Sequence, residues 1–489
     1  MSALENEQMK QFLIFCRFTA SLGLALAMLA CLPGCEPKTP RVVPPPANTN
    51  QNPSALANPN ANGLDACNLI LLPVAGDTPT DQKIAQTQKA VREGGAGLNH
   101  SIEQLGWLFV SKARVTFDPG FYKLAEQCAL CLEDKSPHNP AALSLRGNVL
   151  HSLHRFKEAE PLARELVAQR GLSYDYGLLG DLLMEMGHLD EAIEAYQHMI
   201  DLRPDLYSYT RVAHVRWLKG DLKGAVEALQ LALQSTTPLD PETAAWVYSR
   251  MAQYQLQAGN FEFGLQHTAA ALQYQPKYAP ALLAQGRLLL AEGHEAQAVE
   301  PLRRAATLNP VPEYQWLLVE ALRATGQSDT ALEKELQEHG AASDPRTYAL
   351  YLANENKDPV TAIRLAQEEL KTREDVFTHD ALAWALASAG HYAEAADQMD
   401  QALSQGTQDA RLFYHAGIIE ENQGKYRDAL QSFIEADGLR QMLLPSERAQ
   451  VGDHLLALGL SGTDWEAQSP DANPDRIARA NTKTGFSTQ

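Results

Sequence analysis

A short pattern that recurs about every 34 residues constrains this chain more than any other feature. A glycine is followed five positions later by an alanine at 187–192, 220–225, 293–298, 326–331, 390–395 and 424–429. Weaker copies stand at 154–159, 259–264 and 357–362, and an irregular first copy ends at Ala125. The last residues of these ten copies are 31 to 39 residues apart, and most intervals are 33 or 34. Such a period indicates one repeat array rather than several separate domains.

Each copy contains two helical segments with apolar periodicity, and the glycine lies between them. We expect the glycine to end the first helix, because a residue without a Cβ adopts left-handed backbone at little cost. The small alanine lies inside the second helix, where the two helices of a copy approach closely. Prolines at the ends of several copies (Pro204, Pro276 and Pro310) would end one copy and start the next.

One copy, with Gly180, Gly187, Ala192, Tyr196 and Pro204 in consensus places, resembles the tetratricopeptide repeat. The resemblance extends over residues 100–440 and implies an all-α fold, an α-solenoid of about ten helix-turn-helix repeats. Two departures are visible. The 39-residue interval predicts a longer loop around 236–241 or a slight kink there. The short copy at 354–362, which lacks its glycine, is predicted to be the weakest point of the stack.

The N-terminal segment is predicted to be a targeting signal rather than part of the fold. After Lys10 and Arg17, residues 18–32 form an apolar stretch that is too short to span a bilayer and suits the core of a signal peptide. The sequence that ends at Cys35 resembles a bacterial lipobox, which implies that Cys35 is lipidated; Cys31 closes a rival box. An uncleaved membrane anchor or a buried helix is the alternative.

If residues 1–35 are a lipoprotein signal peptide, the protein is lipid-anchored in the bacterial cell envelope and touches the membrane only through that lipid. Because Glu36, and not an aspartate, follows Cys35, we expect the protein on the outer membrane, facing the periplasm, if the source is Gram-negative. The remaining segments are predicted as a Pro/Asn-rich disordered tether at 36–62, an N-terminal capping segment at 63–99, a C-terminal capping helix at 441–460 and a disordered tail at 461–489.

Charge and motifs narrow the function. The chain carries 41 Lys and Arg against 60 Asp and Glu, a formal net charge of −19, which argues against a nucleic-acid partner. Nucleophile-elbow, P-loop, zinc-protease and Rossmann patterns do not occur in the sequence. We therefore expect a non-catalytic protein with no cofactor and no metal site; an enzyme with an unrecognised site is the remote alternative.

Three cysteines leave alternatives open. Cys128 and Cys131 are three residues apart and share one face of a helix. They could simply pack in the core, or one of them could form a disulfide with Cys67, since export would place the chain in an oxidising compartment. A metal or redox role would need further ligands or a helix-start position, which this pair lacks.

The tetratricopeptide resemblance implies that the first helices line a concave groove. Its candidate partner-binding residues are His214, Trp217, Gln253, Arg287, Trp316, Glu320, Arg323, Tyr351, Asn354 and Trp384. Aromatic, Arg and Asn side chains suit a protein or peptide partner, so we expect an interaction scaffold. A glycan is the alternative ligand: the protein would be an accessory subunit of polysaccharide export or assembly, with Trp217, Trp316 and Trp384 stacking on sugars. In the plainer alternative, each aromatic side chain only fills a gap between helices.

Overall fold

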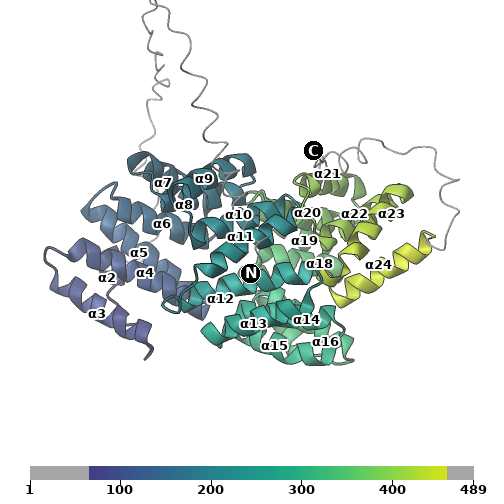
Figure 1. Cartoon of the computed structure of the whole chain (residues 1–489), viewed down its shortest axis with the longest axis horizontal. Coiled ribbons are helices and arrows are strands. Elements are labelled where there is room, and N and C mark those ends of the chain that lie inside the picture. The colour runs from purple at the N-terminus through teal and green to yellow at the C-terminus, as the bar shows by residue number, and fades with distance from the viewer. Residues whose placement is uncertain (1–64, 460–489) are drawn as a thin grey trace, which may run out of the picture. The chain divides into compact units, whose positions relative to one another are not determined.

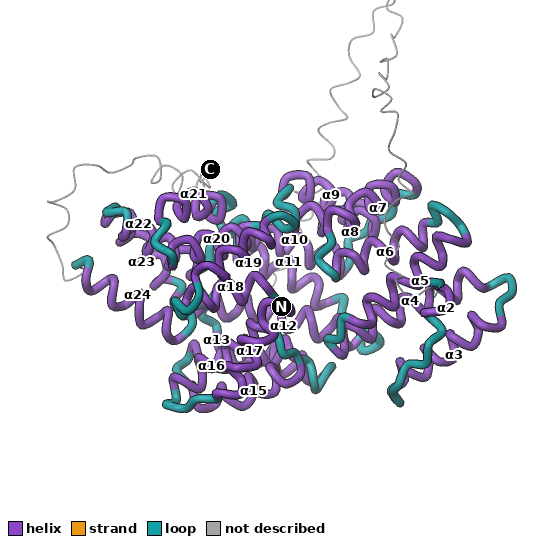
Figure 2. The backbone as a smooth tube through the Cα atoms, turned by 180° about the vertical axis from the view of Figure 1, so that it is seen from behind, coloured by secondary structure: helices purple, strands orange, loops and turns teal. Residues whose placement is uncertain are grey.

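The computed structural model describes residues 65–459. The predicted signal peptide with Cys31 and Cys35, the tether and the tail at 461–489 lie outside the described residues. Within them the chain forms 23 α-helices, one short 3-10 turn and no strand (Figure 2). The expected all-α solenoid is confirmed. None of the described helices is both long enough and apolar enough to cross a membrane.

Twenty of the helices form ten antiparallel hairpins that follow one another along the chain (Figure 1). The first five are α4–α5 (Leu98–Thr116, Gly120–Lys135), α6–α7 (Pro140–Ser152, Phe156–Gln169), α8–α9 (Ser173–Glu185, Leu189–Leu202), α10–α11 (Leu206–Leu218, Leu222–Gln234) and α12–α13 (Pro241–Gln257, Phe261–Tyr274). The last five are α14–α15 (Ala279–Ala291, Glu295–Leu308), α16–α17 (Pro312–Ala324, Thr330–Ser343), α18–α19 (Pro345–Asn354, Pro359–Leu370), α20–α21 (Val376–Ser388, Tyr392–Leu403) and α22–α23 (Ala410–Asn422, Tyr426–Gly438).

Shorter elements flank the hairpins. In front of α4 lie α2 (Ala66–Leu69) and α3 (Pro79–Glu93), and α3 begins with a capping box between Thr78 and Asp81. After α23, the 3-10 turn η2 (Arg440–Met442) leads into α24 (Pro445–Ala457). These two sets of elements lie within the predicted N-terminal capping segment (63–99) and around the predicted C-terminal capping helix (441–460).

The local geometry follows the repeat pattern. Seven glycines at the turn between the two helices of a copy, from Gly187 to Gly424, have φ between 70° and 81°. This left-handed backbone confirms that the glycine ends the first helix. His154 and Asn356 adopt φ of 57° and 48° at or beside the same place in the two copies that lack the glycine. A Cβ on Gly180 would lie only 2.4 Å from the ring of Tyr196, which explains the small residue where the two helices meet.

The two departures from the period appear in the helices. The long interval places six residues between α11 and α12, and α12 itself has 17 residues. The short copy at 354–362 has the shortest first helix of the ten hairpins, α18, with 10 residues. Whether this copy is the weakest part of the stack stays a prediction.

The buried core is divided unequally along the array. From Ala279 in α14 to Leu455 in α24, the buried apolar side chains form one continuous cluster. The hairpins before α14 are filled instead by several separate clusters, such as the one around Phe109 and Cys128 and the one around Phe156 and Tyr196. Side chains on the concave positions of the two halves therefore lie in different surroundings.

Candidate functional site

Loops of the last repeats contact the C-terminal ends of first helices from earlier repeats. The Thr407 hydroxyl donates to the Leu218 carbonyl at 2.7 Å, and the Gln257 side-chain amide donates to the Gln408 carbonyl at 2.7 Å. Farther toward the N-terminus, the Glu374 backbone N–H donates to the Glu185 carbonyl at 3.1 Å. Hydrogen bonds between residues more than 150 positions apart thus join the two halves of the array on its inner side.

The η2 turn and the start of α24 continue this line of contacts. The Gln441 side-chain amide donates to the Gln257 carbonyl at 2.5 Å, and Arg287 donates from Nη2 to the Met442 carbonyl at 3.2 Å. The Ser446 backbone N–H donates to Oε2 of Glu320 at 3.1 Å. The inner face of the middle repeats is therefore partly covered by the chain's own C-terminal segments.

A cavity of about 700 Å³ remains between these two sets of elements. Its walls come from the ends of α8, α10, α12 and α14 on one side. The starts of α18, α20 and α22, with Met442 of η2, form the other side. Four of the predicted groove residues line it: His214, Trp217, Gln253 and Arg287. The structure thus brings this part of the predicted set together around one space.

Trp217 is the central aromatic side chain of the cavity. Its ring stacks on His214, Phe377 and Tyr254, with centroid distances of 5.6, 5.8 and 6.3 Å. Its indole N–H donates to Oε1 of Gln257 at 2.6 Å. The ring is therefore held in one orientation by partners from α10, α12 and α20.

The cavity is rich in paired charges. Arg373 and Arg346 contact Asp375 at 2.8 and 3.0 Å, and Arg373 also contacts Glu185 at 2.6 Å. Although burial raises the pKa of Asp375, the two arginines together hold it below the ordinary value. Burial, with a smaller contribution from Arg250, lowers the pKa of His214 to about 3, so this imidazole is neutral at physiological pH.

Four other predicted groove residues do not face an open groove, and this part of the hypothesis needs correction. Trp316, Glu320, Tyr351 and Trp384 are 3%, 2%, 0% and 8% exposed. Trp384 stacks on His415 at 4.1 Å, and the Trp316 ring contacts Tyr351 at 5.8 Å and the Arg411 guanidinium at 5.1 Å. These side chains fill gaps between helices, because α24 and neighbouring first helices cover them.

Arg323 and Asn354, the last two predicted groove residues, lie outside the cavity lining. Arg323 forms a two-pronged ion pair with Glu355, with N–O distances of 2.5 and 3.0 Å. The hydrogen bonds to Glu355 raise the pKa of Arg323 despite partial burial. Asn354 is half-buried, and its side-chain oxygen has no hydrogen-bond partner among the described residues.

Several cavity residues were missed from the sequence. Arg250 lies on α12 one turn before Tyr254, and the repeat alignment gave no reason to single it out. Phe377 of α20 and Met442 of η2 come from segments far along the chain. The pattern of a single copy carries no signal for such contacts, because they depend on how the array closes back on itself.

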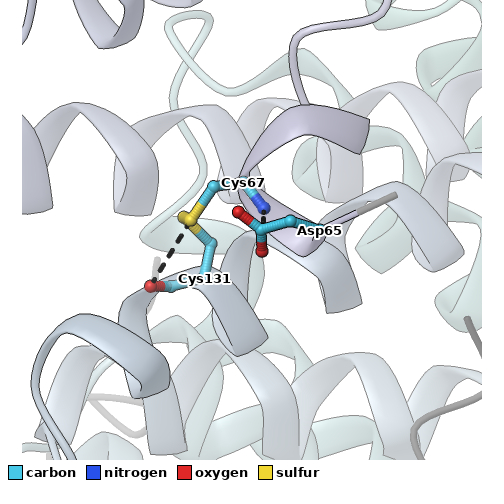
Figure 3. Close-up of a disulfide and its surroundings, with 3 residues drawn as sticks. All are labelled: Asp65, Cys67 and Cys131. Carbon is cyan, nitrogen blue, oxygen red and sulfur yellow. Dashed lines mark hydrogen bonds between the residues drawn. A yellow bond between two sulfur atoms is a disulfide. The ribbon is translucent and has the colours of Figure 1, made fainter. Parts of the chain in front are cut away.

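The cysteines lie at the N-terminal end, away from the cavity. Cys67 of α2 and Cys131 of α5 form a disulfide, with Cα atoms 5.0 Å apart (Figure 3). Cys128 is a free, fully buried thiol in the core, and burial raises its pKa. Within residues 65–459, no cluster of His, Cys, Asp or Glu has the arrangement of a metal site.

Comparisons with known proteins agree with the repeat. Models of the tetratricopeptide repeat match residues 176–206 and 381–439, which correspond to α8–α9 with the first residue of α10, and to α20–α23. No curated protein sequence matches the chain.

Three proteins are among the solved structures to which the chain is similar. The APC/C hetero-tetramer Cut9–Hcn1 is 14% identical, with a TM-score of 0.31, over 78% of this chain and 96% of that one. The human IFIT1 dimer with PPP-AAAA is 16% identical, with a TM-score of 0.37, over 73% and 77%. YrrB, a TPR protein with an unusual peptide-binding site, is 16% identical, with a TM-score of 0.28, over 40% and 97%.

Proposed function

We propose that this chain is a non-catalytic interaction scaffold, lipid-anchored in the bacterial cell envelope, which binds a protein or peptide partner at the central cavity. Tetratricopeptide repeats suggest protein–protein interaction in general. The single observation that carries the specific proposal is the grouping of His214, Trp217, Gln253 and Arg287 around one space. Partly exposed aromatic and Arg side chains at the centre of a concave face are the residue types that dominate protein interfaces.

The proposed compartment has separate support. A lipobox-like sequence ends at Cys35, which makes Cys35 the proposed lipidation site. The disulfide between Cys67 and Cys131 is the kind of bond that persists in exported proteins and is rare in the cytosol. Labelling with a palmitate analogue tests the anchor: Cys35→Ala should abolish it, and unchanged labelling would move the lipid to Cys31 or another residue.

The glycan alternative loses two of its three stacking residues. Trp316 and Trp384 are buried, so only Trp217 is open to a ligand. A sugar-binding surface usually needs exposed ring faces, and one half-buried indole offers a small one. We therefore place a protein or peptide first and treat glycan retention as an outcome of the test.

The test is affinity capture with the full chain, its Trp217→Ala variant and a control, Arg364→Ala, whose side chain lies exposed on α19. A partner of this site should be enriched by the wild type and the control but lost with Trp217→Ala, while circular dichroism shows that all three are folded. If the same proteins are retained by all three, or if only glycan is retained, the proposal is wrong.

A further inference from the structure

Arg250 differs from the other arginines of the cavity. Arg287, Arg346, Arg373 and Arg411 each lie within 4.0 Å of a carboxylate. Within residues 65–459, Arg250 has neither an ion pair nor a hydrogen bond, and its guanidinium carbon lies over the Trp246 ring, 5.8 Å from the ring centroid. A partly buried cation without an anion is costly, and a bound anion would remove that cost.

The acidic side chains of the cavity do not supply this anion. Glu185 and Asp375 are bound to Arg373, and Glu313 is paired with Arg287. Asp380 is hydrogen-bonded to His415, and Glu374 lies near Lys157. The last acidic residue of the cavity lining, Asp409, accepts from the Arg411 backbone N–H at 2.9 Å. A negatively charged ligand in the cavity would therefore gain most electrostatic stabilisation next to the Arg250 guanidinium.

Two neutral groups beside Arg250 also lack partners. The hydroxyl of Tyr254 and Nδ1 of His214 are buried atoms with no hydrogen-bond partner among the described residues. Tyr254 is only 2% exposed, and it lies one helical turn after Arg250 on α12. Arg250 is near enough to lower the pKa of both groups. Burial has the larger effect on each: it also lowers the pKa of His214, but it raises that of Tyr254 to about 12. A phenol hydroxyl donates readily to a carboxylate oxygen.

Flat apolar surface borders the same place. Trp217 is stacked between His214, Tyr254 and Phe377, at interplanar angles of 17° to 22°. Trp217, Tyr254 and Phe377 all line the cavity, and aromatic rings favour offset or edge-on contact with a further planar group. The cavity volume of about 700 Å³ is in the range of small-molecule sites.

We infer that the cavity is a binding site for a small aromatic carboxylate, with the carboxylate on the Arg250 guanidinium and the ring against Trp217. The Tyr254 hydroxyl donates a second hydrogen bond to the carboxylate. This inference goes beyond the proposed function, because it concerns a small ligand and does not require a macromolecular partner. The same chemistry would also accept an aromatic residue at the free carboxyl end of a peptide.

Three probes that differ by one group each test the site by isothermal titration calorimetry on the full chain. N-acetylphenylalanine has both ring and carboxylate, its amide lacks the charge, and N-acetylalanine lacks the ring. We expect the first to bind roughly tenfold more tightly than either of the others, as a charge-assisted hydrogen bond or a buried ring predicts. Equal dissociation constants for the acid and the amide would overturn the inference.

Variants assign the effect to residues. Arg250→Met should remove the preference for the acid over the amide, and Tyr254→Phe should weaken the acid severalfold while the ring packing is kept. Arg364→Met, which removes an exposed arginine on α19, should change nothing. If Arg250→Met does not fold, Arg250→Lys is the fallback variant. It keeps the charge but loses the planar guanidinium, and it should reduce the preference for the acid over the amide. An unchanged preference in a folded Arg250 variant contradicts the site.

This test and the test of the proposed function fail independently. Binding of N-acetylphenylalanine without any captured partner would support the cavity site and contradict the scaffold. A captured partner that is lost with Trp217→Ala, together with equal binding of the acid and the amide, would support the scaffold and overturn the carboxylate site.

Discussion

The concave positions of the middle repeats and those of the later repeats carry similar side chains but have different surroundings. In α10, α12 and α14, Trp217, Gln253 and Arg287 border a cavity. In α16, α18 and α20, Trp316, Tyr351 and Trp384 are buried in a continuous core that reaches α24. An aromatic residue on the inner stripe of a solenoid is thus available to a partner only where no other part of the chain covers it.

The largest expected difference is in tryptophan truncation. Trp384→Ala should lower the free energy of unfolding by about 4 kcal/mol, because a buried aromatic side chain leaves a cavity. Trp217→Ala should cost less than about 2 kcal/mol, since its ring is already partly exposed. Urea unfolding followed by circular dichroism measures both. Equal costs would mean that the two halves of the stripe are not distinct.

Next in size is the ion pair that holds α24 against α22. Arg411 donates from Nε to the fully buried Glu447 at 2.9 Å and lies over the Trp316 ring. Arg411→Met should cost about 3 kcal/mol, because it leaves a buried carboxylate without its partner. Hydrogen exchange should then increase first in α24. If only α10 and α12 exchange faster, α24 does not stabilise the covered half.

A smaller effect is expected where the two halves meet. Thr407 is fully buried, and its hydroxyl donates to the Leu218 carbonyl. Thr407→Val removes this one donor and should cost about 1 kcal/mol, with faster exchange around the end of α10. Thr307→Val is the matched control: its exposed hydroxyl bonds only within its own helix, and its loss should cost under about 0.5 kcal/mol. Equal effects would mean that the contact between the halves adds no stability.

The repeat itself could be predicted from the sequence because its signals are local. The glycine of each turn, Ala192 inside a second helix and Gly180 opposite Tyr196 each report on neighbours within one copy. The period then gives the number of copies. The same signals place Trp217 and Trp384 on the inner stripe of first helices, and the repeat pattern alone gives no difference between the two residues.

What separates them is contact between residues far apart in the sequence. Thr407 meets Leu218 and Ser446 meets Glu320, and the pattern within a copy holds no information about such pairs. Small rotations between successive repeats add up and decide which repeats meet. For the same reason Phe377 and Arg250 could be recognised as cavity residues only from the structure.

Glu320 offers the finest test of the covered half, through pH. It is 2% exposed, and burial raises its pKa above the ordinary value; the hydrogen bonds from Ser446 oppose this shift, and nearby Glu447 adds a smaller increase. Above the ordinary glutamate pKa of about 4.3 the unfolded chain has released this proton while the folded chain still holds it. Stability from this residue is therefore full at low pH and falls as pH rises through the unfolded and then the folded pKa.

Glu320→Gln removes this titration but keeps an oxygen that accepts from Ser446. The variant and the wild type should unfold at nearly the same urea concentration below the ordinary glutamate pKa. As the pH rises, the wild type should lose stability relative to the variant, so that Glu320→Gln becomes the more stable chain at neutral pH. Glu313→Gln, on the same helix but partly exposed at the cavity, should show no such gain, because its carboxylate is paired with Arg287. A wild type that gains on Glu320→Gln with rising pH would mean that Glu320 is solvated or fully paired, and that the cover over the later repeats is open in solution.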